Sequence, residues 1–198
     1  MKLISNQLYH IYNQGNNQET IFLEKDDYLN FLFSARNLLL THSDILAYCL
    51  MPNHFHFLVD VTEKSVQEIK LGGIFVNQLT NAFRLLLSNY AQDFNKKYNR
   101  SGSLFRQKTK GKCLKNIEAN KNYPLICFHY IHQNPLKAKL VEKMEDWDFS
   151  SFKDYAKYRN GTFINKELAF KYLPIYPNSF YDDSYKIIDD DLIDGLLE

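Results

Sequence analysis

Two histidines stand one residue apart in a segment that is typical of a β-strand. Residues 50–60 are rich in aromatic and aliphatic side chains, and the run is entered through a proline. Because side chains alternate along a strand, His54 and His56 point to one face, and the intervening phenylalanines point to the other. Two imidazoles on one face can share a divalent metal or hold a phosphate, and a third ligand would have to come from elsewhere in the fold.

A second pair of functional side chains lies on a predicted helix that includes residues 127–135. Tyr130 and Asn134 are four residues apart, so they occupy one face of that helix. A tyrosine hydroxyl is a usable nucleophile toward phosphorus, and an amide oxygen is a hard ligand that suits Mg²⁺ or Mn²⁺. If this face packs on the histidine strand, His54, His56 and Asn134 can hold one metal ion beside the tyrosine hydroxyl. Such an ion would act as a Lewis acid on a phosphodiester.

Each of these elements also has a purely structural explanation. Alternating histidines occur by chance on strands, and a tyrosine in mid-helix is most often a half-buried core residue. Taken singly, each element favours the structural explanation; together with the basic segment described next, they give the two explanations about equal weight. The remaining histidines are weaker candidates, in apolar runs, at a helix end or on another side of the Tyr130 helix: His10, His129, His42 and His132.

Charge is distributed unevenly along the chain, although its formal net charge is only +1. Between residues 80 and 140, twelve Lys and Arg outnumber two acidic residues, which gives this segment a net charge of +10. Residues 182–198 carry seven acids and one lysine, a net charge of −6. The basic residues are mixed with aromatics and a glycine turn, so we expect this segment to bind a polyanion. For the acidic tail, a solvated surface is the simpler interpretation.

Composition predicts a soluble protein with one domain of ordinary size. The chain has 198 residues, and 45% of them are hydrophobic, which is enough for a substantial core. Its three cysteines are an odd number without metal-ligand spacing, so we expect reduced thiols. The sequence shows no signal-peptide pattern and no apolar run of membrane-spanning length, and the predicted location is the cytoplasm.

Hydrophobic periodicity and turn residues predict alternating strands and helices. The chain begins with a strand over 7–14, a helix capped by Asp26 or Asp27 and extending to about 40, and a hairpin of strands 45–50 and 54–61. A helical region follows from 65 to about 98, with a weak point at Gly72-Gly73, and then a turn at 100–103 and a strand or strand pair over 104–114. The last predicted elements are a helix from Pro124 to about Gln133, ended by Pro135, and a short helix after Trp147.

This order indicates an α+β fold, a ferredoxin-like antiparallel sheet with helices mainly on one face. We expect residues 1–160 to form this domain and residues 161–198 to add a peripheral helix and an acidic tail. After residue 104, cations occupy every second position, which on a strand would place all four on one face. They are Arg106, Lys108, Lys110 and Lys112.

Four sequence blocks between residue 9 and about residue 155 form a recognisable series. They are Tyr9-His10-Ile11 with Gly15-Asn16-Asn17, the run 47–59, the run 101–105, and the run 130–141 with Trp147 and Ser150-Ser151. In order and spacing the series resembles the HUH single-tyrosine transposases and, most closely, the REP-associated tyrosine transposase branch. The second and fourth blocks are the most specific.

The resemblance implies an HUH nuclease fold and an enzyme that cleaves single-stranded DNA near a hairpin through a 5′-phosphotyrosine intermediate. It implies that Tyr130 is the nucleophile and that His54, His56 and Asn134 bind Mg²⁺ or Mn²⁺. Basic side chains would hold phosphates, and an exposed phenylalanine would stack on bases. The expected DNA contacts are Arg100, Phe105, Arg106, Lys108, Lys110 and Lys112.

The basic block departs from the related branches because it is mostly lysine, which suits holding the DNA backbone more than reading bases. The main alternative function is a hairpin-binding protein of the same fold that does not cleave; the intact histidines and Tyr130 favour the enzyme. A plain α+β interaction module with structural histidines would leave the basic segment without a partner. The expected partner is single-stranded DNA with a hairpin, and no contact with a membrane is expected. The expected oligomeric state is a monomer or a homodimer.

Overall fold

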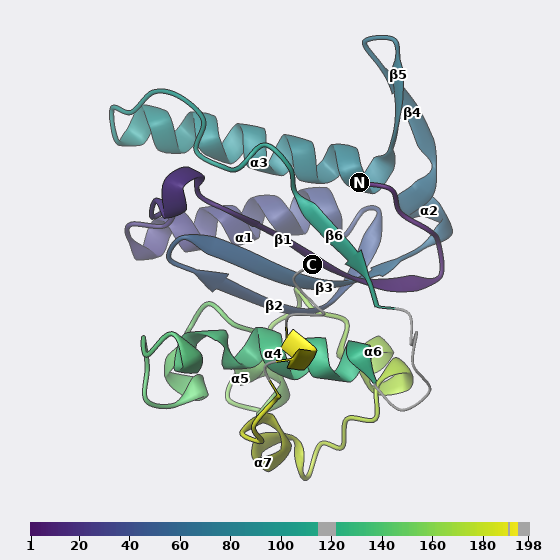
Figure 1. Ribbon diagram of the computed structural model, residues 1–198, viewed down its shortest axis with the longest axis vertical. Coiled ribbons are helices and arrows are strands. Elements are labelled where there is room, and N and C mark those ends of the chain that lie inside the picture. The colour runs from purple at the N-terminus through teal and green to yellow at the C-terminus, as the bar shows by residue number, and fades with distance from the viewer. Residues whose placement is uncertain (115–121, 190, 194–198) are drawn as a thin grey trace.

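The centre of the protein is a four-stranded antiparallel sheet (Figure 1). The computed structural model describes residues 1–114, 122–189 and 191–193. The sheet has the order β2-β3-β1-β6, built from β1 (Gln7–Gln14), β2 (Ser43–Met51), β3 (His54–Val61) and β6 (Lys110–Cys113). Some charged residues of the basic segment and the acidic tail lie outside the described residues: Lys115, Glu118, Lys121, Asp190, Asp194 and Glu198.

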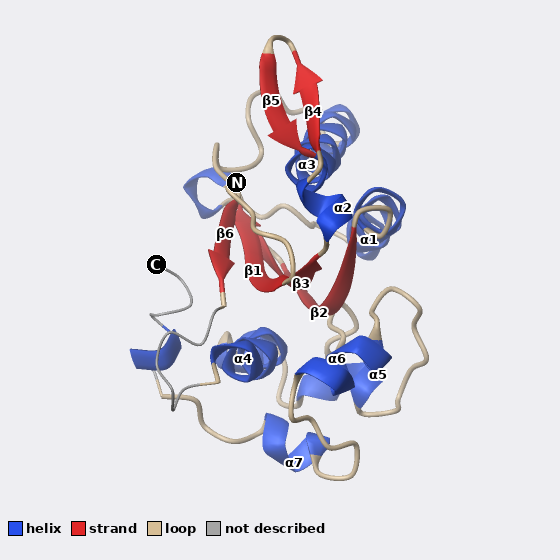
Figure 2. Cartoon of the chain, turned by 90° about the vertical axis from the view of Figure 1, so that its right-hand side faces the viewer, coloured by secondary structure: helices blue, strands red, loops and turns tan. Residues whose placement is uncertain are grey.

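Helices cover both faces of this sheet. The two crossover helices, α1 (Lys25–Leu39) and α3 (Gln78–Lys97), lie side by side on one face, as Figure 2 shows. With the sheet order, they complete the βαββαβ ferredoxin-like arrangement, so the α+β class and antiparallel sheet are confirmed. Outside this unit, α4 (Tyr123–Lys137) packs on the opposite face against β2 and β3. The helices are therefore less one-sided than the sequence indicates.

The hairpin of β2 and β3 explains how the histidines are placed. Met51 pairs with His54, so Pro52 and Asn53 form a two-residue connection, as predicted. β3 lies between β2 and β1 and is buried along almost its whole length. The ring of Phe55 packs against Phe31 of α1, at 5.3 Å between centroids. The side chains at the alternate positions of β3, which include both histidines, therefore face α4.

The predicted helical region over residues 65–98 is wrong in its first part. The chain forms a short helix α2 (Glu63–Val66) and then a hairpin of β4 (Glu68–Leu71) and β5 (Ile74–Asn77), which projects beyond the end of α3 in Figure 1. Gly72 and Gly73 have φ values of +52° and +91°, a left-handed pair that a two-residue hairpin needs and a helix cannot use. What looked like a weak point in a helix is a turn between strands.

The basic run after residue 104 is also less regular than predicted. β6 comprises only Lys110–Cys113, and residues 106–109 loop out of the sheet. The side-chain amide of Asn13 holds this loop by donating to the Arg106 carbonyl and to Thr109 Oγ1, both at 3.1 Å. Immediately before this loop, Phe105 forms an isolated β-bridge with Gly15. The alternation of cations therefore does not extend over one continuous strand.

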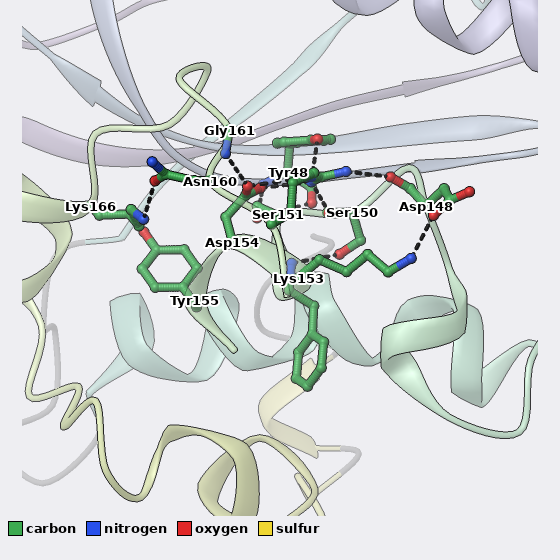
Figure 3. Close-up of polar contacts among 12 residues, drawn as sticks. Tyr48, Asp148, Ser150, Ser151, Lys153, Asp154, Tyr155, Asn160, Gly161 and Lys166 are labelled. Carbon is green, nitrogen blue, oxygen red and sulfur yellow. Dashed lines mark hydrogen bonds and ion pairs between the residues drawn. The ribbon is translucent and has the colours of Figure 1, made fainter. Parts of the chain in front are cut away.

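The segment after α4 folds back over it through short helices: α5 (Phe152–Tyr155), α6 (Lys166–Tyr172) and α7 (Phe180–Ser184). The short helix predicted after Trp147 is thus confirmed. Figure 3 shows the polar contacts that attach it to β2, where the Ser151 backbone and hydroxyl meet the backbone of Tyr48. The buried Asp154 carboxylate pairs with Arg159 at 2.6 Å and accepts a hydrogen bond from the Gly161 amide.

None of the helices within the described ranges is both long and apolar enough to span a membrane.

Asp27 ties the start of α1 to the end of α3. The helix begins at Lys25 with Glu24 as its N-cap, so Asp27 occupies the third helical position rather than the cap. Its buried carboxylate accepts hydrogen bonds from two backbone amides, from Lys97 at 2.6 Å and from Tyr98 at 2.8 Å. Burial acts to raise the pKa of Asp27, but these hydrogen bonds outweigh it and the pKa lies below the ordinary 3.8.

We expect Asp27→Asn to lower the free energy of unfolding at pH 7 by about 1.5–3 kcal/mol, because hydrogen bonds to a charged acceptor are lost. A carboxylate whose pKa is depressed on folding stabilises the protein above the unfolded pKa, and this contribution disappears as pH falls through the folded pKa. Urea unfolding should therefore show a gap between wild type and variant that narrows below about pH 4. Asp26→Asn, the same change at the exposed neighbour, is the control; an equal gap at pH 7 and pH 3 would contradict the assignment.

Candidate active site

Four residues that the sequence selected meet between the sheet and α4. The rings of His54 and His56 lie on the α4 side of β3, with centroids 4.9 Å apart. Tyr130 reaches them from α4 and packs edge-on against His56, at 5.5 Å between centroids. Asn134 lies one turn further along α4, where its side chain acts on the pKa values of both His54 and Tyr130.

The hydrogen bonds of His54 determine which of its nitrogens is available. His54 Nδ1 lies 2.6 Å from Asn53 Oδ1, an oxygen that can only accept. The Asn53 amide nitrogen donates to the Gln18 carbonyl, which is consistent with this orientation. Nδ1 therefore carries the proton, and Nε2 of the neutral ring keeps its lone pair. Burial lowers the pKa of His54, an effect that Asn134 partly opposes, so the neutral form is favoured.

His56 is the most enclosed of the four, with 3% of its surface exposed. Its Nδ1 is joined to His10 Nε2 at 2.8 Å, while its Nε2 is buried with no hydrogen-bond partner among the described residues. Burial lowers the pKa of His56 well below the ordinary value, and the neighbouring His10 and His54 add to this effect. Because an unpaired buried polar atom is costly, a ligand at this Nε2 would stabilise the site, although His42 and His132 each also bury an unpartnered Nδ1.

Tyr130 and Asn134 are positioned by α4 itself. Asn122 caps the helix by accepting from the Leu125 amide, and Pro124 lies in its first turn. The helix continues to Lys137, so Pro135 does not end it as predicted; in the last turn, the loss of one donor leaves helical geometry intact. The Asn134 amide nitrogen donates to the Tyr130 carbonyl at 2.8 Å, which leaves Oδ1 as the free acceptor of this amide.

The Tyr130 hydroxyl is held in its neutral form. The residue is 8% exposed, and burial raises its pKa to about 12, with the Asn134 hydrogen bond acting in the opposite direction. A neutral phenol is a weak nucleophile, so any attack by this oxygen needs help in losing its proton.

These atoms fit a small divalent cation. His54 Nε2, His56 Nε2 and Asn134 Oδ1 are two imidazole nitrogens and one amide oxygen, a set that suits Mn²⁺ and, with added water or phosphate oxygens, Mg²⁺. The unpartnered Nε2 of buried His56 is the observation that favours a ligand here. Within the described ranges, no group of three or more His, Cys, Asp or Glu side chains is arranged to hold a metal, so an ion at this position would depend on Asn134.

The predicted DNA-contacting cations divide into three groups. Lys110 and Lys112 pair with Tyr12 and His10 in the β1–β6 register, so they lie on the sheet face that carries the candidate site. Arg106 and Lys108 are exposed on the loop that leaves the sheet. Arg100 instead forms an ion pair with Glu19 and hydrogen bonds to Asn95 and Ser103, which commits its guanidinium to the fold.

The expected exposure of Phe105 is wrong. Its ring is 6% exposed and packs against Tyr90 and Phe55, at 6.0 and 6.3 Å between centroids. The bridge between Phe105 and Gly15 draws this part of the chain onto the end of β1. The ring is therefore part of the core and is not a freely exposed platform for stacked bases.

Two residues near the site were not selected from the sequence. His10 and Tyr12 stack on each other at 4.7 Å, and both rings lie beside His56. Each is on β1, and the β1–β3 register places them on the α4 side of the sheet. The sequence signal for this placement is that His10 and Tyr12 are two residues apart, like the histidines of β3. The pairing of β1 with β3, which brings the two sets of side chains together, cannot be read from either segment alone.

Comparison with known proteins gives matches in both sequence and structure. No protein-family model matches the chain. A protein from Haemophilus influenzae, provisionally described as a REP-associated tyrosine transposase, is 28% identical over 131 residues, which cover 64% of this chain and 69% of that protein. A solved REP-associated tyrosine transposase bound to a REP hairpin superimposes with a TM-score of 0.56 at 17% identity, over 81% of this chain and 84% of that one. The structural match shows a shared fold.

We expect His10→Phe to weaken Mn²⁺ binding about 10- to 100-fold, because the partner that orients His56 is lost while ring volume is nearly kept. The measurement is titration with Mn²⁺ alone, followed by electron paramagnetic resonance of the free ion. His42→Gln, at a histidine in the turn before β2, is the control and should bind as wild type does. Equal affinity of His10→Phe and wild type would remove His10 from the site.

Proposed function

The chain resembles the REP-associated tyrosine transposases in sequence and in fold, and on this basis we propose that it is a metal-dependent single-stranded DNA endonuclease and strand transferase. It would cleave beside a DNA hairpin through a 5′-phosphotyrosine intermediate. The observation that carries the proposal is the packing of Tyr130 against His56, with His54 beside His56 and Asn134 one turn further along α4.

In the proposed reaction, the Tyr130 oxygen attacks a phosphodiester phosphorus. A bond forms between this oxygen and phosphorus while the bond to the 3′-oxygen breaks; the tyrosine proton is released and the departing 3′-oxygen becomes a hydroxyl. A later 3′-hydroxyl reverses the exchange, so the bond energy is conserved and no external energy source is needed. A divalent ion such as Mg²⁺ or Mn²⁺, held by His54, His56 and Asn134, would supply Lewis-acid stabilisation of the phosphoryl oxygens.

The protein's own residues prepare this step in two ways. Burial of Tyr130 between α4 and the sheet excludes water from the nucleophile, and its contact with His56 fixes the ring. Asn134 partly offsets the effect of burial on the pKa of Tyr130, which favours loss of the proton during attack. Lys110 and Lys112, on the same sheet face, would hold the phosphates that flank the cleaved bond.

The proposed partner is DNA with a hairpin and an unpaired flank. The structural relative is bound to a REP hairpin, and this chain shares its fold. A second candidate function is a hairpin-binding protein that does not cleave. The burial of Tyr130 and its raised pKa favour this second candidate, because both oppose formation of the phenolate.

We expect wild-type protein with Mn²⁺ and a flanked hairpin oligonucleotide to form a covalent protein–DNA adduct, and Tyr130→Phe to bind the same DNA with no adduct. The measurement is denaturing gel electrophoresis and mass spectrometry, which should place a phosphodiester on the Tyr130 peptide. Tyr123→Phe, the same change at the start of α4, is the matched control and should still form the adduct.

Binding by wild type without an adduct, over a panel of hairpins with different flanks, would support the non-cleaving function. An adduct retained in Tyr130→Phe would mean that another residue is the nucleophile.

A further inference from the structure

A groove of about 640 Å³ lies between α3 and the loop that precedes β6. It opens on the α1–α3 side of the sheet, the face opposite to Tyr130. Asn13 contributes to it from β1, where its side chain alternates with that of Tyr12. Ser88 lines it from α3, and residues 103–109 form its other wall. The proposed reaction at Tyr130 does not use this groove.

The lining of this groove combines an apolar floor with a cationic rim. The floor consists of the partly exposed side chains of Leu87 and Ala91 together with the buried side chains of Phe83, Leu104 and Phe105. The rim carries Arg84, Arg106 and Lys108, all exposed, for which the described residues show no ion pair. The lining residues include no Asp or Glu. A ligand that fits has a flat apolar part and a negative charge, which describes a nucleotide within a DNA strand.

The groove is connected to the candidate site along one short segment. Arg106 and Lys108 border the groove, and Lys110 and Lys112 follow directly on β6, on the Tyr130 face. β6 is an edge strand, so nothing in the sheet lies beyond it to block a passing DNA strand. Four cations in seven residues therefore lead around the sheet edge from one face to the other.

The loop wall is shaped by fixed hydrogen bonds. Asn13 holds both ends of the loop through the Arg106 carbonyl and Thr109 Oγ1, and the Arg106 amide donates to the Gln14 carbonyl at 2.9 Å. Gln107, between the two rim cations, is exposed and carries both a donor and an acceptor. A wall held in this way can present an amide to the edge of a base without first becoming ordered.

We propose that this groove binds an unpaired nucleotide of the same DNA strand that Tyr130 attacks. The base rests on the apolar floor, and its phosphates contact Arg84, Arg106 and Lys108. The proposal rests on the proposed function, because it takes single-stranded DNA as the ligand. It adds a second contact region, on the opposite side of the sheet from the reacting tyrosine.

The test compares one hairpin oligonucleotide with and without a mixed-sequence single-stranded flank, using fluorescence anisotropy. Ser88→Trp places a large side chain in the groove without changing charge; Asn89→Trp, at the next and exposed residue of α3, is the matched control. We expect Ser88→Trp to weaken binding of the flanked hairpin about tenfold and to leave the flank-free hairpin unchanged, since loss of one stacked base has an effect of this size. Asn89→Trp should leave both unchanged.

A second variant tests the rim. Lys108→Ala should weaken binding of the flanked hairpin and reduce the slope of log K against log salt concentration by about one, with Lys96→Ala on α3 as the control. In wild type, 5-iodouracil placed in the flank should cross-link to the peptide that contains residues 103–109.

The outcomes separate this proposal from the proposed function. Adduct formation at Tyr130 with no flank-specific effect of Ser88→Trp would contradict nucleotide binding in the groove and support the proposed cleavage activity. A flank-specific loss without any adduct would support the groove and contradict cleavage. Equal losses on both oligonucleotides, no flank dependence in wild type, or no binding of either DNA would overturn the groove proposal.

Discussion

The packing of α4 against the histidine face of β3 is the contact on which the candidate site depends. β3 is buried along almost its whole length and His54 is only partly exposed, so the His56 imidazole cannot rely on water for hydrogen bonds. Neighbouring chain segments meet this requirement: Asn53 for His54, and His10 on β1 for His56. α4 then covers both rings with Tyr130 and Asn134. Within this site, His56 Nε2 is buried without a hydrogen-bond partner among the described residues, at the point where a ligand would complete the set.

The position of α4 is fixed from its other side as well. His132 Nε2 lies 2.7 Å from Ser151 Oγ, which is itself bonded to the Tyr48 backbone on β2. The Gln133 amide donates to the carbonyls of Ser184 and Lys186, both at 2.8 Å. Tyr130 and Asn134 thus face the sheet while the residues between them face the segments that follow α4. The segments that follow α4 contribute no reacting group, but they hold Tyr130 in position beside the two histidines.

Sequence reasoning succeeded where a feature depends on local periodicity and failed where it depends on pairing. The alternation of His54 and His56 and the helical spacing of Tyr130 and Asn134 are local, and the structure shows both. The β4–β5 hairpin was missed because Gly72-Gly73 interrupts a run that also has helical spacing, and only φ values distinguish a turn from a weak helix. The role of His10 beside His56 and the burial of Phe105 follow from strand register and tertiary contact, which no single segment encodes.

The interrupted basic strand has the largest consequence for function. Had residues 106–112 formed one strand, all four cations would lie on one face of the sheet. Asn13 instead bonds the two ends of the loop and takes residues 106–109 out of the ladder, which moves Arg106 and Lys108 to the α3 side. Lys110 and Lys112 remain on the Tyr130 side. A single departure from strand geometry, fixed by one buried amide, thus places positive charge on both sides of this sheet edge.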